Sequence, residues 1–168
     1  MLKHHADLLL AMVRFDDGDP ARIQHNVKVH SFAAMIGVLE GIPEETQFIL
    51  ETAAIVHDIG IRPSMKKYGS MSGTYQQIEG PGEADKMMRE LGGYTEDQIE
   101  RVKYLIAHHH TYDNIDGLDY QILVEADFLV NLHEDGSSKE TVAHTCKKIF
   151  RTETGMKILR EMFRIEEE

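Results

Sequence analysis

The stretch AAIVHDIGI, residues 53–61, places an imidazole and a carboxylate side by side at the end of an apolar run. Four apolar residues lead directly into His57-Asp58, and Gly60 follows shortly after. Inside a helix two consecutive side chains diverge by about 100°, whereas at a helix end both can turn towards one point. The stretch therefore allows two interpretations: a solvated helix end, or adjacent nitrogen and oxygen donors that bind one metal ion.

The composition is typical of a soluble globular protein. With 168 residues, 42% hydrophobic and 28% charged, the chain is long enough to form one domain, residues 1–168, around its own core. Its formal net charge of −11 argues against a nucleic-acid polymer or an anionic membrane surface as partner. Cys146 is the only cysteine, and we find neither a signal peptide nor an apolar run approaching the ~20 residues that span a bilayer. We therefore expect a cytoplasmic protein.

Apolar residues recur at helical spacing along most of the chain, which predicts a compact all-α bundle. Asp19 and Pro20 have the residue types that cap and open a helix, and Thr95 with Gln98 forms a capping-box pattern. Residues 59–80 contain four glycines and a proline, so we predict a long loop there, followed by a short helix over residues 82–93. We also expect C-terminal helices within residues 138–168.

Several potential metal ligands lie in apolar helical contexts. They are His25, the pair His57-Asp58, the run His108-His109-His110 and Asp127. An unpaired carboxylate would be costly within the apolar run around Asp127, so this side chain needs a cation or strong hydrogen-bond donors. Imidazoles and carboxylates that converge from separate helices of a bundle satisfy one another best around a metal ion.

The ordered set His25, His57-Asp58 and Asp127 resembles the H…HD…D signature of the HD-domain superfamily of metal-dependent phosphohydrolases. The segments HNVKVHSFA, AAIVHDIG and VEADFLVNL carry the resemblance, which covers roughly residues 20–133. It implies an all-α HD-type fold, a metal held by these four residues, and hydrolysis of phosphate esters, often nucleotides. Two imidazoles and two carboxylates without a thiolate suit Mn, Fe, Co, Ni or Zn, with Mg also possible.

Some HD subfamilies hold a second metal with additional histidines between the doublet and the last aspartate. His109, with His108 or His110, matches that position, but the usual histidine further upstream is missing. Glu79 falls near the expected place and is the candidate replacement. The resemblance therefore leaves open a centre with one metal and a centre with two.

We interpret the chain as a metal-dependent phosphohydrolase for a small phosphorylated substrate, with nucleotides as the leading candidates. Asp58 is the expected catalytic residue, because it can orient or deprotonate the attacking water. Arg22, Lys66 and Lys67 are candidates for binding phosphate, although each could equally form an ordinary surface contact. A di-iron oxygenase with the HD fold and a nucleotide-binding module with little turnover remain the alternatives.

The other histidines are expected to be structural. We predict that His4, His5 and His133 lie at the surface and that His30 is either a surface or an ordinary core residue.

Overall fold

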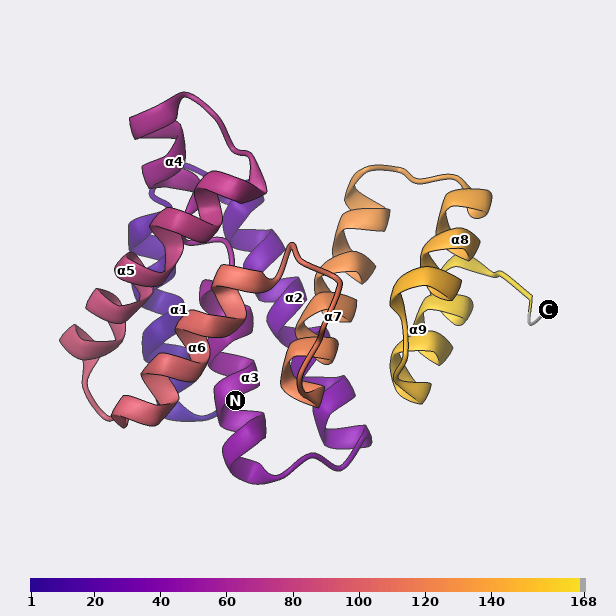
Figure 1. Cartoon of the computed structure of the whole chain (residues 1–168), viewed down its shortest axis with the longest axis horizontal. Helices are drawn as coiled ribbons and strands as arrows, with labels where there is room; N and C mark the ends of the chain where they lie inside the picture. The colour runs from indigo at the N-terminus through magenta and orange to yellow at the C-terminus, as the bar shows by residue number, and fades with distance from the viewer. Residues whose placement is uncertain (167–168) are drawn as a thin grey trace.

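The computed structural model describes residues 1–166, and all regular structure within them is helical. This confirms the predicted all-α fold (Figure 1). The helices are α1 (Lys3–Phe15), α2 (Pro20–Leu39), α3 (Glu44–Val56), α4 (Ile61–Tyr68), α5 (Gly73–Leu91), α6 (Glu96–His108), α7 (Leu118–Glu134), α8 (Lys139–Ile149) and α9 (Glu153–Phe163). Two of them lie in the predicted C-terminal helical segment, whose last two residues fall outside the described part of the chain.

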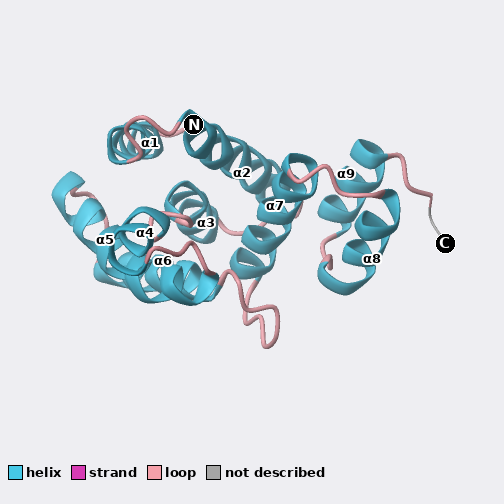
Figure 2. Cartoon of the chain, turned by 90° about the horizontal axis from the view of Figure 1, so that it is seen from above, coloured by secondary structure: helices cyan, strands magenta, loops and turns pink. Residues whose placement is uncertain are grey.

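Helix α2 packs against both α3 and α7, and these three helices form the middle of the bundle. The pair α5 and α6 lies on one side of them, while α8 and α9 lie beyond α7 at the opposite end (Figure 2). The apolar core is continuous from Leu8 in α1 to Leu159 in α9. Among residues 1–166, no helix combines the length and the apolar character needed to cross a bilayer.

The predicted helix starts are present. The Asp19 side chain accepts a hydrogen bond from the Arg22 backbone N–H at 2.9 Å, with Pro20 at the first helical position. Thr95 and Gln98 form the reciprocal capping box that opens α6. These caps satisfy backbone donors that have no partner within the helix, so they fix where each helix begins.

The prediction of a long loop over residues 59–80 is wrong. Helix α4 occupies most of the first half, and α5 begins at Gly73 and continues through Pro81, so that the expected short helix is only its second part. Gly60 serves close packing: a Cβ there would lie 2.5 Å from the Gln76 carbonyl oxygen and 3.0 Å from the Gly80 nitrogen. Glycine thus lets the backbone of α5 approach the turn that follows the His57-Asp58 doublet.

A buried carboxylate in α7 connects this helix to the C-terminal pair. Glu125, which is fully buried, accepts hydrogen bonds from the backbone N–H groups of Arg151 at 2.6 Å and Thr152 at 2.9 Å. It also accepts one from the Gln121 amide at 2.7 Å and one from the Thr152 hydroxyl. The same Thr152 hydroxyl caps α9, so α7, α9 and the connection between α8 and α9 share one polar contact.

Two of the three histidines predicted at the surface, His4 and His133, are exposed. The prediction is wrong for His5, which is fully buried, and His30 is a core residue. Helix α1 packs across α3, and this long-range contact covers His5.

Candidate metal centre

Three helices bring the four predicted ligands together. His25 lies in α2, His57 and Asp58 directly follow α3, and Asp127 lies in α7. The Nε2 atoms of His25 and His57 are 3.2 Å apart, and the Asp127 Oδ1 atom lies 3.3 Å from the first and 3.5 Å from the second. The Asp58 Oδ2 atom lies 3.6 Å from both nitrogens. The helix end therefore turns both residues of the doublet towards the same point.

The hydrogen bonds of the two imidazoles identify which ring nitrogens face this point unprotonated. The Nδ1 atom of His57 lies 2.9 Å from the Ala54 carbonyl oxygen, and that of His25 lies 2.9 Å from a Glu134 carboxylate oxygen. Both oxygens only accept, so each Nδ1 donates, and a neutral ring then carries a lone pair on Nε2. With both rings neutral, two lone pairs and two carboxylates thus face one another, an arrangement that requires positive charge among them, either a metal ion or protons.

A divalent transition metal fits this set of donors. Ligand atoms about 2.1 Å from one ion lie about 3.0–3.4 Å apart for angles between about 90° and 109° at the ion. The separations between the two imidazole nitrogens, and from these nitrogens to the carboxylate oxygens, are 3.2–3.6 Å and fall close to this range. The atoms are nitrogen and oxygen, which suits Mn, Fe, Co, Ni or Zn. His25, His57, Asp58 and Asp127 would be the residues that hold the metal.

The electrostatics of the centre also favour a cation. Burial lowers the pKa of His25, but hydrogen bonding to Asp127 and the charge of Asp58 outweigh burial and leave the pKa raised. The pKa of His57 is raised for the same kind of reason, against its complete burial. The pKa values of Asp58 and Asp127 are lowered by their histidine neighbours despite burial. Both carboxylates are therefore ionised at neutral pH, and the centre attracts positive charge.

Two residues of α7 support the ligands and were not predicted. The Asn131 amide donates to the Asp127 Oδ1 atom at 2.8 Å, and Glu134 orients the His25 ring. They lie four and seven positions after Asp127, so helical spacing places all three on the same face of α7. That spacing is a signal from which the sequence could have identified them. Such partners fix the orientation and the tautomer of metal-binding side chains.

A second group of donors adjoins the first through Asp58. The donor atoms of Asp58, His109 and His110 lie within 4.8 Å of one another. His109 donates through Nδ1 to the Ile106 carbonyl oxygen at 2.7 Å, so its buried Nε2 carries a lone pair without a hydrogen-bond partner, 3.7 Å from the Asp58 Oδ1 atom. The two oxygens of Asp58 thus face different groups of histidines.

The structure does not bring the other candidates for a second metal to this group. His108 is directed away, with its Nδ1 atom 2.7 Å from the Tyr104 carbonyl oxygen. Glu79 faces α4, where its Oε1 atom accepts hydrogen bonds from the Lys67 ammonium and the Tyr68 hydroxyl, each at 2.7 Å. The expectation that Glu79 replaces the missing histidine is therefore not met. Instead the buried Gln76 approaches His110, with 3.3 Å between its Oε1 atom and the His110 Nε2 atom.

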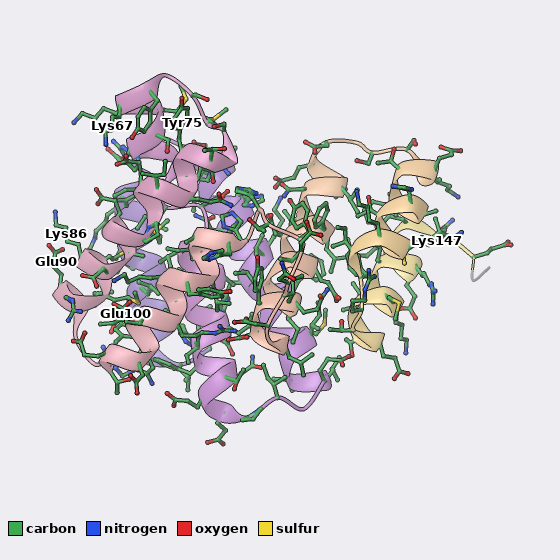
Figure 3. The ribbon with its side chains drawn as sticks, viewed as in Figure 1. Lys67, Tyr75, Lys86, Glu90, Glu100 and Lys147 are labelled. Atoms are coloured by element: carbon green, nitrogen blue, oxygen red, sulfur yellow. The ribbon has the colours of Figure 1, made fainter. Side chains whose placement is uncertain are left out.

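The candidate phosphate-binding residues have different environments. Lys67 is already paired with Glu79 and lies near Tyr75 where α4 and α5 meet (Figure 3), and Lys66 is exposed. Arg22 instead donates from Nη1 to the Asp58 Oδ2 atom, while its Nε is buried and has no hydrogen-bond partner. Arg22 also lines a surface pocket of ≈ 340 Å³ together with Arg62, which the sequence argument did not single out. Of the three candidates, Arg22 is the one that contacts the centre.

Comparison with known proteins identifies the family. The family model described as HD domain matches residues 22–149, which extends beyond the predicted region of similarity into α8. HD domains bind divalent metals and are generally metal-dependent phosphohydrolases. Searches of the curated proteins and of the solved structures found no match. Because the matched region spans most of the chain and contains all four converging residues, this protein belongs to the HD domain family.

Proposed function

We propose that this protein is a metal-dependent phosphohydrolase that acts on a small phosphorylated molecule, with nucleotides as the first candidates. The observation that carries the proposal is the buried cluster of His25, His57 and Asp58, together with Asp127 beside both imidazoles, within a family that is generally hydrolytic. A bound divalent metal would lower the pKa of a coordinated water and offset negative charge that develops on a phosphoryl group.

Asp58 is suited to the catalytic role because its two oxygens have different surroundings. Its Oδ2 atom faces the nitrogens of His25 and His57, whereas Oδ1 faces the unpartnered Nε2 atom of His109. The carboxylate can therefore hold the metal with one oxygen and orient or deprotonate water with the other. Its lowered pKa keeps it ionised, as both tasks require.

Arg22 is the proposed phosphate-binding residue. Its guanidinium already contacts Asp58, and the buried, unpartnered Nε–H is a donor that an anionic oxygen can satisfy. The pocket that it lines with Arg62 has a volume of ≈ 340 Å³, which suits a small molecule. A net charge of −11 would repel a nucleic-acid polymer, so we propose a free phosphate ester as substrate, in a reducing cytoplasm compatible with the single buried Cys146.

We further propose that Asp58, His109 and His110 can hold a second, weaker metal. The supporting observation is the buried Nε2 atom of His109, which has no hydrogen-bond partner and lies beside the Asp58 carboxylate. Two metals bridged by a carboxylate are a known arrangement for phosphoryl chemistry. Metal analysis in excess Mn²⁺ tests this: the His109→Gln protein should bind one equivalent fewer than the unaltered protein.

The test of the main proposal combines metal analysis with phosphate release. The purified protein is supplied with each candidate metal and incubated with a panel of nucleotides and other phosphate esters. We expect phosphate release that disappears in Asp58→Asn, together with most of the bound metal, but persists in Asp135→Asn, which alters an exposed residue. Full metal occupancy in both Asp58→Asn and Asp127→Asn would refute the ligand assignment. Nucleotide binding without phosphate release would identify a binding module, and iron-dependent oxygen uptake would identify an oxygenase.

A further inference from the structure

A second cluster of potential ligands lies where α1, α2 and α3 meet, and it shares no residue with the candidate metal centre. His5 comes from α1, His30 from α2 and Glu51 from α3. The Glu51 Oε2 atom lies 3.0 Å from the His5 Nδ1 atom and 3.0 Å from the His30 Nε2 atom. His5 is 0% exposed and His30 is 4% exposed, so both imidazoles have lost their contact with water.

The hydrogen bonding of His5 indicates that a cation is needed. Its Nε2 atom lies 3.3 Å from the Phe48 carbonyl oxygen, which only accepts, so the neutral tautomer that satisfies this oxygen carries the hydrogen on Nε2. The Nδ1 atom then has a lone pair directed at the Glu51 carboxylate, and it is buried without a hydrogen-bond partner. A lone pair 3.0 Å from an anionic oxygen is unfavourable unless a positive charge lies between them.

The surroundings of Glu51 keep it ionised and leave one oxygen available. Burial raises the pKa of Glu51, but its contacts with His30, His5 and Gln47 outweigh burial and hold the pKa far below its usual range. The Gln47 amide donates to Oε1 at 2.8 Å, whereas Oε2 faces the two imidazoles. The cluster thus offers two nitrogen donors and one carboxylate oxygen.

We propose that His5 Nδ1, His30 Nε2 and Glu51 Oε2 form a divalent-metal site that is separate from the candidate metal centre. It is of the kind that binds Zn²⁺ or Co²⁺, and it would link α1 to α2 and α3. The three donor atoms lie within 4.8 Å of one another, and the two measured separations of 3.0 Å match donors about 2.1 Å from a common ion. Two histidines and a glutamate are a familiar ligand set for zinc. Glu51 and His5 also line a surface pocket of ≈ 440 Å³, through which water can supply the remaining ligand.

A proton is the competing cation. If His5 or His30 carried a hydrogen on the nitrogen that faces Glu51, as a cation or as the corresponding neutral tautomer, it would donate to Glu51 and the cluster would be a hydrogen-bonded core group without a metal. The two cases differ in whether the site retains a metal ion at neutral pH, and this difference can be measured without any enzymatic activity.

The experiment uses the full chain in which the first centre has been disabled by Asp58→Asn and Asp127→Asn, here called the parent. Co²⁺ is added at neutral pH, free metal is removed by gel filtration, and the metal per chain and the visible absorption of bound Co²⁺ are recorded. We expect the parent to retain one Co²⁺ per chain at this site, displaceable by Zn²⁺. Adding His5→Gln or Glu51→Gln should remove that equivalent, whereas the matched control His4→Gln, at an exposed neighbour, should keep it.

Circular dichroism establishes that each protein is folded, and metal-dependent melting provides a second measurement. Zn²⁺ should raise the melting temperature of the parent and of the His4→Gln control, but not that of the His5→Gln protein, because a metal stabilises only a fold that binds it. Should His5→Gln fail to fold, His30→Gln takes its place. A parent that retains no Co²⁺, or a folded His5→Gln protein that retains as much as the parent, would overturn the proposal while leaving the phosphohydrolase proposal intact.

Discussion

At the scale of single residues, the Asp58 carboxylate contacts a guanidinium and several imidazoles in the candidate centre. It faces the Arg22 guanidinium and the imidazoles of His25, His57 and His109. Arg22 is the cation that this carboxylate already contacts. In the proposed function it would compete with a metal for Asp58 and would exchange that contact for a substrate phosphate. This double role can be separated by mutation.

The first prediction is that Arg22→Gln raises KM for a phosphorylated substrate by about tenfold or more, because a charged hydrogen bond to phosphate is lost. Metal affinity should be retained or increased, since a competing positive charge is removed from Asp58. Steady-state kinetics and metal titration measure the two effects separately. Arg14→Gln, which alters an exposed arginine, is the control, and an unchanged KM in the Arg22 variant would count against its phosphate role.

The second prediction concerns Asp16, a carboxyl group that the sequence argument did not identify. Burial raises its pKa from the ordinary value of 3.8 to about 6. The folded protein therefore disfavours the ionised form: the cost is absent below pH 3.8, grows as the pH rises between the two values, and is complete above about pH 6.

Asp16→Asn should consequently stabilise the protein at pH 7 by about 1–3 kcal/mol. The gain should shrink as the pH is lowered towards 4. Urea unfolding at several pH values measures this difference, with Asp17→Asn at the exposed neighbouring position as the control. A gain that stays the same at pH 4.5 and pH 7 would contradict the assigned cause.

At the scale of helices, the close approach of α5 to the turn after α3 sets the position of the doublet. Gly60 has no left-handed backbone conformation, since its φ is −70°, so the requirement for glycine there is purely one of space. A side chain would press against the backbone of Gln76 and Gly80, which cannot rotate away as a flexible side chain can.

The third prediction is that Gly60→Ala destabilises the protein by about 1–3 kcal/mol or more and weakens metal binding, because the displaced turn carries Asp58. The matched control is Gly82→Ala in α5, where an added Cβ would meet nothing within 4 Å. That change should stabilise the helix by up to about 1 kcal/mol. Chemical unfolding and metal titration of both variants provide the comparison, and equal effects of the two substitutions would contradict the packing argument.

The helices also show which structural features the local sequence predicts. Caps in neighbouring residues predict where α2 and α6 begin. The local sequence context likewise predicts the placement of His25 and of the His57-Asp58 doublet. The glycines of residues 59–80 were misinterpreted, because glycine marks a tight backbone approach as well as a loop, and only the packed structure distinguishes the two.

The same distinction applies to the residues of the candidate site. The contact between Gln76 and His110, like the burial of His5, depends on how distant helices cross, and no local pattern specifies such crossings. Glu134 could have been found by helical spacing from Asp127, once the face of α7 that carries Asp127 was recognised. The convergence of His25, His57, Asp58 and Asp127 was therefore predictable from the sequence, whereas contacts that depend on crossing helices, such as that of Gln76, were not.

At the scale of the whole molecule, the candidate metal centre joins α2, the end of α3 and α7, and so crosses the middle of the bundle. The fourth prediction is that removing metal with a chelator at neutral pH lowers the melting temperature. A free metal concentration of 100 times Kd stabilises by about 2.7 kcal/mol, which corresponds to roughly 5–10 °C for a chain of this size.

The effect of the chelator should diminish as the pH is lowered. The raised pKa values of His25 and His57 mean that protons occupy the metal-free centre already above pH 6.5, where they stabilise it and compete with metal. Calorimetric scans with and without chelator should thus differ most at and above neutral pH and converge in acid. A melting temperature that does not respond to chelator at neutral pH would contradict a metal bound between the helices.

The carboxylate of Glu125 has a consequence for the order of events during synthesis on the ribosome. Its backbone donors at Arg151 and Thr152 follow 26 and 27 residues later in the chain, so a nascent polypeptide in which only α7 has emerged lacks these two donors to the Glu125 carboxylate. Asp127 lies two positions beyond Glu125 in the same helix. We therefore expect α7 to pack fully against α2 and α3 only after the first turn of α9 has left the exit tunnel. We therefore expect the candidate metal centre to form late in translation, although His25, His57, Asp58 and Asp127 have by then already emerged.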